Sequence, residues 1–107
     1  PGEVILDGFR VRCIPAGEIV NSTNVFTILP RGELILRSRE AGDSIRLPGG
    51  SKLLKKLFID RKIPAAQRSR IPLVADDEGV LGVWSIGVNQ DRVATALPAI
   101  QIQIEQL

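Results

Sequence analysis

The chain has 107 residues, 44% of them hydrophobic, and a formal net charge of +2 at pH 7. This size suits one domain whose core needs neither disulfides nor metal. With no histidine and one cysteine, an internal disulfide, a Ser-His-Asp or Cys-His mechanism and most transition-metal sites are excluded. No apolar run approaches the roughly 20 residues of a membrane helix, and no secretory pattern opens the chain. We therefore expect a cytoplasmic protein with no membrane partner and, since methionine is absent, a fragment of a longer polypeptide.

Alternating apolar residues predict strands at both ends of the chain. Residues 4–6 and 9–14 form a pair joined by a turn at Asp7-Gly8. Cys13 would be a small buried hydrophobe in the second of these strands. Residues 100–105 alternate strictly, which is typical of a strand with one buried face.

Two further strands are predicted over residues 25–29 and 33–39, with Pro30-Arg31-Gly32 as the turn between them. Because side chains alternate along a strand, Arg37 and Arg39 would lie side by side on one face.

A helical pattern follows the loop Pro48-Gly49-Gly50. Ser51 is the expected N-cap of an amphipathic helix over residues 52–61. Its expected core face consists of Leu53, Leu54, Leu57 and Phe58. Its expected basic face consists of Lys52, Lys55, Lys56 and Lys62. Ile59 falls among these lysines and fits only if it contacts another element or domain, and fraying near Arg61 would explain why that residue projects toward the apolar side.

Pro64 interrupts this helix and starts a short second helix over residues 65–69. Residues 72–76 and 80–86 predict a hairpin whose second strand is apolar on both faces and therefore central. The acidic run 76–78 is explained better by the hairpin turn than by a Mg²⁺ or Ca²⁺ site.

Basic residues are concentrated in one third of the chain. Residues 37–70 contain ten Lys and Arg but three Asp and Glu, a net charge of +7, and the remainder carries −5. This asymmetry fits either a polyanion partner or a solvated basic face. Gly50, Ser51 and Lys52 fit either a phosphate-binding nest at the helix start or an ordinary loop-to-helix junction. Since Phe58, the one aromatic of the segment, belongs to the core face, we expect shape or backbone recognition of a folded RNA or duplex rather than base stacking.

Three motifs follow one another in and after this segment. They are R-x-R-x-x-G-D within residues 36–47, G-x-K-x-L-K-x-x-F within residues 50–60, and I-P-x-x-x-R-x-x-x-P-L-V over residues 63–74. Their order and spacing, over about residues 34–97, resemble the C-terminal domain of bacterial tRNA(Ile)-lysidine synthetases.

The resemblance implies an α+β, mostly antiparallel and sandwich-like domain, of a type also found in the phenylalanyl-tRNA synthetase β subunit. Residues 1–107 would be this single domain. It also implies a larger parent enzyme, a ligase that uses ATP and Mg²⁺ to convert the wobble cytidine of tRNA(Ile) to lysidine. An N-terminal catalytic domain would perform that chemistry, whereas this chain would hold no cofactor, no metal and no catalytic residue. Its expected partners are tRNA(Ile), near the acceptor stem, and the N-terminal domain.

The basic residues and the glycine loop supply the expected tRNA contacts. These are Arg37, Arg39, Ser51, Lys52, Lys55, Lys56, Arg68 and Arg70. One alternative is a non-catalytic module whose basic face and Ile59 dock on an acidic domain of the parent protein. An independent small enzyme is disfavoured because histidine and a nucleotide-binding loop are both missing.

Overall fold

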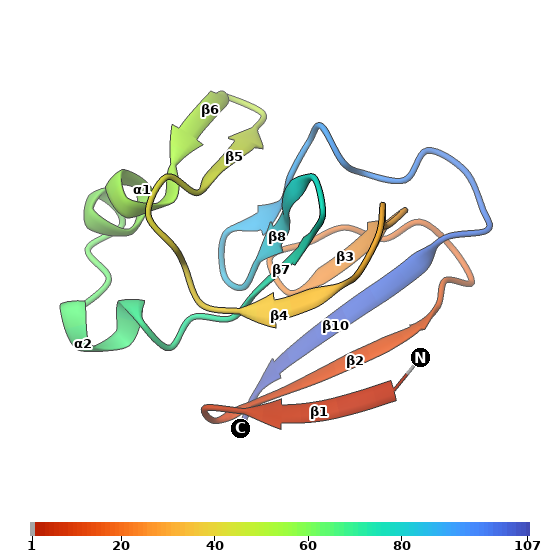
Figure 1. The fold of residues 1–107 in the computed structure, drawn as a ribbon, viewed down its shortest axis with the longest axis horizontal. Coiled ribbons are helices and arrows are strands. Elements are labelled where there is room, and N and C mark those ends of the chain that lie inside the picture. Colours follow the sequence, from red (N-terminus) through yellow and green to blue (C-terminus); the bar gives the residue numbers. More distant parts are fainter. Residues whose placement is uncertain (1) are drawn as a thin grey trace.

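Two four-stranded antiparallel sheets, a two-stranded hairpin and two short helices make up residues 2–107, the part of the chain that the computed structural model describes (Figure 1). The outer sheet has the strand order β1 (Gly2–Leu6), β2 (Phe9–Pro15), β10 (Ile100–Gln106), β3 (Val25–Ile28). The middle sheet has the order β4 (Ile35–Arg37), β7 (Leu73–Asp76), β8 (Gly79–Val83), β9 (Gly87–Val88). The remaining elements are the hairpin β5 (Ser44–Leu47) and β6 (Gly50–Leu53), and the helices α1 (Leu54–Asp60) and α2 (Ala65–Arg68). The expected α+β, mostly antiparallel fold is confirmed. No helix among these residues has the length and apolar character needed to cross a membrane.

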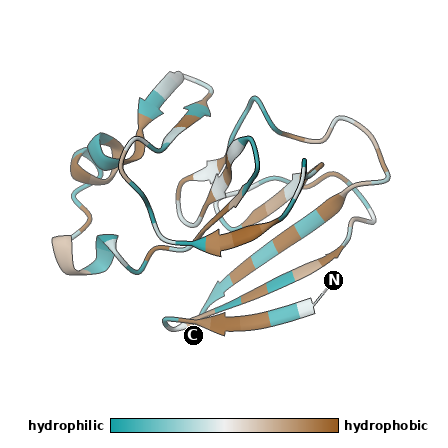
Figure 2. Ribbon diagram, viewed as in Figure 1, coloured by the Kyte–Doolittle hydropathy of each residue, from teal (hydrophilic) through white to brown (hydrophobic). Residues whose placement is uncertain are grey.

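The middle sheet is buried on both faces. Successive side chains of β7 point to opposite faces of the sheet and therefore pack into two different core clusters. Leu73 and Ala75 belong to a core cluster completed by α1 and β5, whereas Val74 belongs to a second cluster shared with the outer sheet. Figure 2 shows the matching pattern on β10, along which apolar and polar residues alternate. The expected central position of β8 and the half-buried character of β10 are both confirmed.

The two sheets approach each other closely at Gly82. A Cβ atom at this position would lie 2.5 Å from a ring carbon of Phe26, which is fully buried on β3. That distance is far inside van der Waals contact, so the ring occupies the space that a side chain would need. A register irregularity between Val74 and Ala75 places Gly82 opposite Val74, beneath the outer sheet.

Most predicted strands are present, with some shorter than expected. The turn at Asp7-Gly8 joins β1 to β2, and Asp77-Glu78 joins β7 to β8. The strand expected over residues 33–39 is limited to Ile35–Arg37 and lies in a different sheet from β3, so Pro30-Arg31-Gly32 connects two sheets instead of closing a hairpin.

The start of the first helix was predicted wrongly. Residues 44–53 form the β5–β6 hairpin, with Pro48-Gly49 as its turn, and the helix begins at Leu54. Ser51 therefore lies in β6 and caps nothing, while Leu53 occupies the N-cap position without a side-chain cap. Pairing of residues 50–53 with β5 outweighs the helical pattern of their side chains, and it leaves Leu53 55% exposed, not in the core.

The acidic run is tied into the structure by Asp76. Its buried carboxylate pairs with both terminal nitrogens of Arg92 and accepts the backbone N–H groups of Arg31 and Glu78 at 2.8 and 2.9 Å. The Arg92 hydrogen bonds outweigh desolvation and lower the pKa of Asp76 to about 2. This carboxylate holds together the start of the β3–β4 connection, the β7–β8 turn and the loop before β10.

Protonation of Asp76 should therefore destabilise the fold. A carboxyl whose pKa falls from 3.8 to about 2 on folding contributes stability above pH 4 that is lost as pH falls toward 2. The shift corresponds to about 2 kcal/mol. In urea unfolding, we expect Asp76→Asn to be less stable than the natural chain at neutral pH, and the difference to narrow by this amount at pH 2. Asp77→Asn, at the exposed neighbouring position, is the control, and a difference for Asp76→Asn that does not change with pH would contradict the assignment.

Candidate nucleic-acid interface

The basic segment folds into one end of the molecule. Residues 38–70, which we call the basic lobe, contain the β5–β6 hairpin, α1, α2 and their connections. Figure 1 shows these elements together on one side of the middle sheet, opposite the outer sheet. The charge asymmetry of the sequence is therefore also an asymmetry in space.

Helix α1 has the expected division into a core face and a basic face. Leu54, Leu57 and Phe58 are buried, whereas Lys55 and Lys56 are exposed. Lys52 is exposed as well, but it lies in β6, just before the helix. Three lysines are thus brought together by the end of the hairpin and the first turn of α1, not by one helix face.

The glycine loop does not form the expected nest at a helix start. Gly50 and Lys52 are in β6, where they pair with Leu47 and Ile45 of β5. The first N–H group of the helix, that of Leu54, donates to the Asp43 carbonyl oxygen at 2.9 Å. Ser51 stays an expected RNA contact only as an exposed residue on the hairpin, opposite Arg46.

Arg37 and Asp43, which begin and end the first motif, form a bidentate ion pair. The Arg37 Nη1 and Nη2 atoms donate to the two Asp43 oxygens at 2.7 and 3.1 Å. The Glu40 N–H also donates to Asp43, at 2.8 Å, and Gly42 makes the intervening turn with a φ of 88°. Desolvation raises the pKa of Asp43, but the hydrogen bonds from Arg37 and Glu40 outweigh it and lower the pKa overall. Arg37 is thus a neutralised support of the basic lobe.

The other expected contacts differ in their surroundings. Arg68 donates from Nε to the Ile63 carbonyl oxygen at 2.8 Å and so ties α2 to the connection that precedes it. Arg70 is exposed and borders a small hollow near Ile63 and Trp84. Arg39 is half-buried beyond the end of β4, so the expected side-by-side placement of Arg37 and Arg39 on one strand is not found.

Two arginines outside the expected set connect the lobe to the rest of the molecule. Arg61 donates from Nη1 to the Ser85 carbonyl oxygen at 3.3 Å, and its own N–H closes the last turn of α1 by donating to Leu57. Helix α1 thus ends in an ordered turn at Arg61, and fraying is not needed to explain its position. Arg46 lies 3.7 Å from Asp91, measured from Nε to Oδ1.

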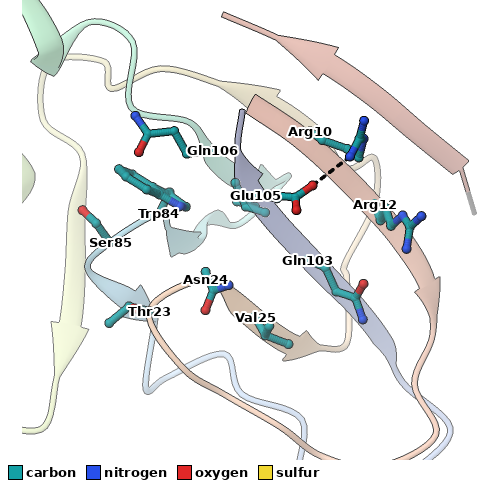
Figure 3. A pocket seen from close by; sticks show the side chains of 11 residues that line it. Arg10, Arg12, Thr23, Asn24, Val25, Trp84, Ser85, Gln103, Glu105 and Gln106 are labelled. Carbon is teal, nitrogen blue, oxygen red and sulfur yellow. Dashed lines mark hydrogen bonds and ion pairs between the residues drawn. The ribbon is translucent and has the colours of Figure 1, made fainter. Parts of the chain in front are cut away.

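Trp84 also has a position that the sequence did not reveal. The strand expected to reach residue 86 ends at Val83, and the Ser85 N–H donates to the Thr23 carbonyl oxygen. Trp84 consequently borders a hollow of about 660 Å³ between this turn, the start of β3 and the outer face of β2 and β10 (Figure 3). We call this space the Trp84 hollow. The sequence carries no signal for it, because Trp84 continues the apolar pattern of residues 80–86.

The Arg37–Asp43 pair should determine the stability of the lobe. Arg37→Lys removes the bidentate geometry while keeping the charge, and we expect a loss of about 2 kcal/mol in urea unfolding. Asp43→Asn should cost a similar amount, and the double variant should cost less than the sum of both. Arg39→Lys is the matched control, expected to change stability by less than about 0.5 kcal/mol. Additive effects of the two single substitutions would show that the pair is not a unit.

Known proteins resemble the chain over most of its length. A family model described as the TilS substrate C-terminal domain matches residues 34–104. A tRNA(Ile)-lysidine synthase of Clostridioides difficile is 43% identical over 61 residues, which cover 57% of this chain and 13% of that protein. The tRNA(Ile)-lysidine synthase of Thermotoga sp. is 31% identical over 83 residues, or 78% of this chain and 17% of that protein. The chain therefore matches less than a fifth of the length of these relatives.

A solved structure, described as the crystal structure of the TILS C-terminal domain, has the same fold. It superposes with a TM-score of 0.84 at 24% identity, covering 100% of this chain and 92% of the other. The similarity includes both sheets and the basic lobe, since no part of the chain is left out.

Proposed function

The chain belongs to the family of TilS substrate C-terminal domains, and from this premise we propose that it is the tRNA-holding module of a tRNA(Ile)-lysidine synthase. In this proposal the parent enzyme works in the cytoplasm and converts the wobble cytidine of tRNA(Ile) to lysidine, using ATP and Mg²⁺. The chemistry belongs to an N-terminal catalytic domain outside these residues. The names of the relatives support this activity of the parent enzyme, and their greater length leaves room for a separate catalytic domain.

One observation carries the RNA-binding role. Among residues 2–107, six arginines form ion pairs with carboxylates, but Lys52, Lys55 and Lys56 form none. All three are exposed to solvent: Lys55 and Lys56 lie on the side of α1 that faces away from the core, and Lys52 lies just before the helix in β6. Uncompensated cations of this kind attract a polyanion, and they contact its phosphates without reading its sequence.

The expected contacts then separate into two groups. The three lysines, Ser51, Arg39 and Arg70 would meet the RNA backbone directly, whereas Arg37 and Arg68 act mainly by holding the lobe in shape. Since the lobe offers no exposed aromatic residue, we assign it to a duplex recognised by its A-form shape. The acceptor-stem region of tRNA(Ile) is the proposed duplex.

Neutralising the lysines should weaken tRNA binding. We expect replacement of Lys52, Lys55 and Lys56 by Gln to reduce affinity for tRNA(Ile) at least tenfold at low salt. For each phosphate that the variant no longer neutralises, the slope of log affinity against log salt should flatten by about 0.9. Fluorescence anisotropy with labelled tRNA at several salt concentrations measures both. The same three positions changed to Arg should keep affinity and slope, and unchanged binding by the Gln variant would refute the assignment.

Exposed apolar side chains beside the lysines support a second candidate, docking on another domain of the parent protein. Leu53 is 55% and Ile59 48% exposed, next to the same basic residues. A surface that mixes apolar and basic groups also suits an acidic protein partner.

Crosslinking distinguishes the two candidates. In the full-length parent protein with tRNA(Ile) bound, we expect a photoreactive group attached at position 55 to label RNA. Labelling of protein alone would favour docking, and Ile59→Ser would then be expected to reduce the protein crosslink. A group attached at position 31, which lies outside the basic lobe beside the β7–β8 turn, is the control for nonspecific labelling.

A further inference from the structure

We propose that the Trp84 hollow binds an unpaired nucleobase of the RNA that the basic lobe holds. This inference rests on the proposed function and adds to it a second site with different chemistry. The basic lobe would contact the backbone of a duplex, and the hollow would accept a base from the single strand that continues from it.

The Trp84 ring is positioned to stack. It packs against Phe9 in an edge-to-face arrangement, with ring centroids 4.7 Å apart at an interplanar angle of 66°, which fixes the ring in place. The residue is half-buried and lies between two hollows, this one (Figure 3) and the smaller one beside Arg70. At about 660 Å³ the hollow lies within the usual range of small-molecule sites, roughly 300–1,000 Å³. A preformed aromatic surface in a space of this size suits a flat ring.

Polar groups around the ring match the edge of a base. Asn24 accepts a hydrogen bond from Ser22 through Oδ1, at 3.0 Å, which fixes its carboxamide and leaves Nδ2 without a partner in residues 2–107. The side chains of Ser85 and Gln106 also make no hydrogen bond within that part of the chain, and all three border the hollow. Together they offer donors and acceptors of the kind that base edges require.

The charge of the hollow favours a base over a phosphate. Arg10 donates to Glu105 at 2.8 Å and lies 3.5 Å from Glu3, and Arg12 donates to Glu3 at 2.9 Å. Glu3 does not line the hollow, but through these pairs neither arginine of the lining is left as an uncompensated cation for an anion. Figure 3 shows Arg10 and Glu105 paired along one side of the space.

A path leads from the basic lobe to the hollow. Arg61, at the end of α1, donates to the Ser85 carbonyl oxygen, and Ser85 belongs to the lining of the hollow. A strand that leaves a duplex on the lobe would thus pass an arginine suited to a phosphate before its base reaches Trp84.

Trp84 is the only tryptophan in the chain, so the tryptophan fluorescence of the chain responds to a base that stacks on its ring. The probes are a blunt RNA duplex, the same duplex with a short unpaired 3′ extension, and a third duplex whose extension has equal length but abasic nucleotides. We expect the natural extension alone to quench Trp84 and to bind on the order of tenfold more tightly than the abasic one, since stacking needs the base. Equal affinity of the two extended duplexes, without quenching, would overturn the proposal.

Variants separate stacking from folding defects. Trp84→Phe keeps an aromatic ring against Phe9 and should keep much of the preference for the natural extension, measured by anisotropy. Trp84→Leu should abolish that preference but leave blunt-duplex binding unchanged. Gln106→Ala should reduce the preference several-fold, whereas Gln90→Ala, an exposed glutamine outside the hollow, should not. Loss of blunt-duplex binding in Trp84→Leu with Gln106→Ala unaffected would identify Trp84 as purely structural and refute the base site.

Failure of this inference differs from failure of the proposed function. If the basic lobe does not bind RNA, the blunt duplex itself does not bind and replacing the lysines has no effect. If only the hollow is misassigned, the blunt duplex binds, responds to the lysines and gains nothing from the extension. Quenching of Trp84 by the parent protein's other domains, and not by the extended RNA, would assign the hollow to a protein segment and overturn the nucleobase proposal.

Discussion

The β7–β8 hairpin is apolar on both faces and must therefore be covered twice. The outer sheet covers one face, and α1 with the β5–β6 hairpin covers the other. The second cover is made from the most basic part of the sequence, so its buried leucines and phenylalanine place its lysines on the far side from the core. Burial of apolar surface in the middle of the molecule thus produces a charged surface at one end. The position of the candidate RNA interface is a consequence of core packing.

Arginine and lysine have different roles in this chain. Arg37 and Arg92 form bidentate pairs with carboxylates, and Arg61 and Arg68 donate to backbone carbonyls, so these guanidinium groups hold separate elements together. The planar guanidinium suits such fixed contacts. The ammonium of lysine is a point charge on a flexible stem, and it can contact phosphates without a fixed geometry. Within the basic segment the guanidinium groups of Arg37, Arg61 and Arg68 make such fixed contacts, whereas the exposed lysines of the lobe make none within residues 2–107.

Local patterns predicted the strands at both ends, the β7–β8 hairpin and the buried face of α1, since these depend on alternation and turn residues close in sequence. The pairing of residues 44–53 was not predictable in this way. The lysines and leucines of residues 52–58 fit a helix as well as a strand, and only the pairing with β5 determines where the strand ends and the helix begins. The Arg37–Asp43 pair depends on the turn at Gly42, since Arg39 and Arg46 both lie closer to Asp43 in the sequence than Arg37 does. The Trp84 hollow depends on residues from β2, β3 and β10, which no local pattern relates to one another.

The contact between Gly82 and Phe26 limits how this domain can vary. The ring of Phe26 occupies the place of a side chain at position 82, so the two positions share one fixed volume between the sheets. A related chain with alanine or a larger residue at the first position must carry a smaller one at the second, or its sheets must move apart. Such a movement would shift β3, and with it Asn24 and the rim of the Trp84 hollow. Substitutions at the two apolar core positions 26 and 82 would therefore set the width of the Trp84 hollow at the surface.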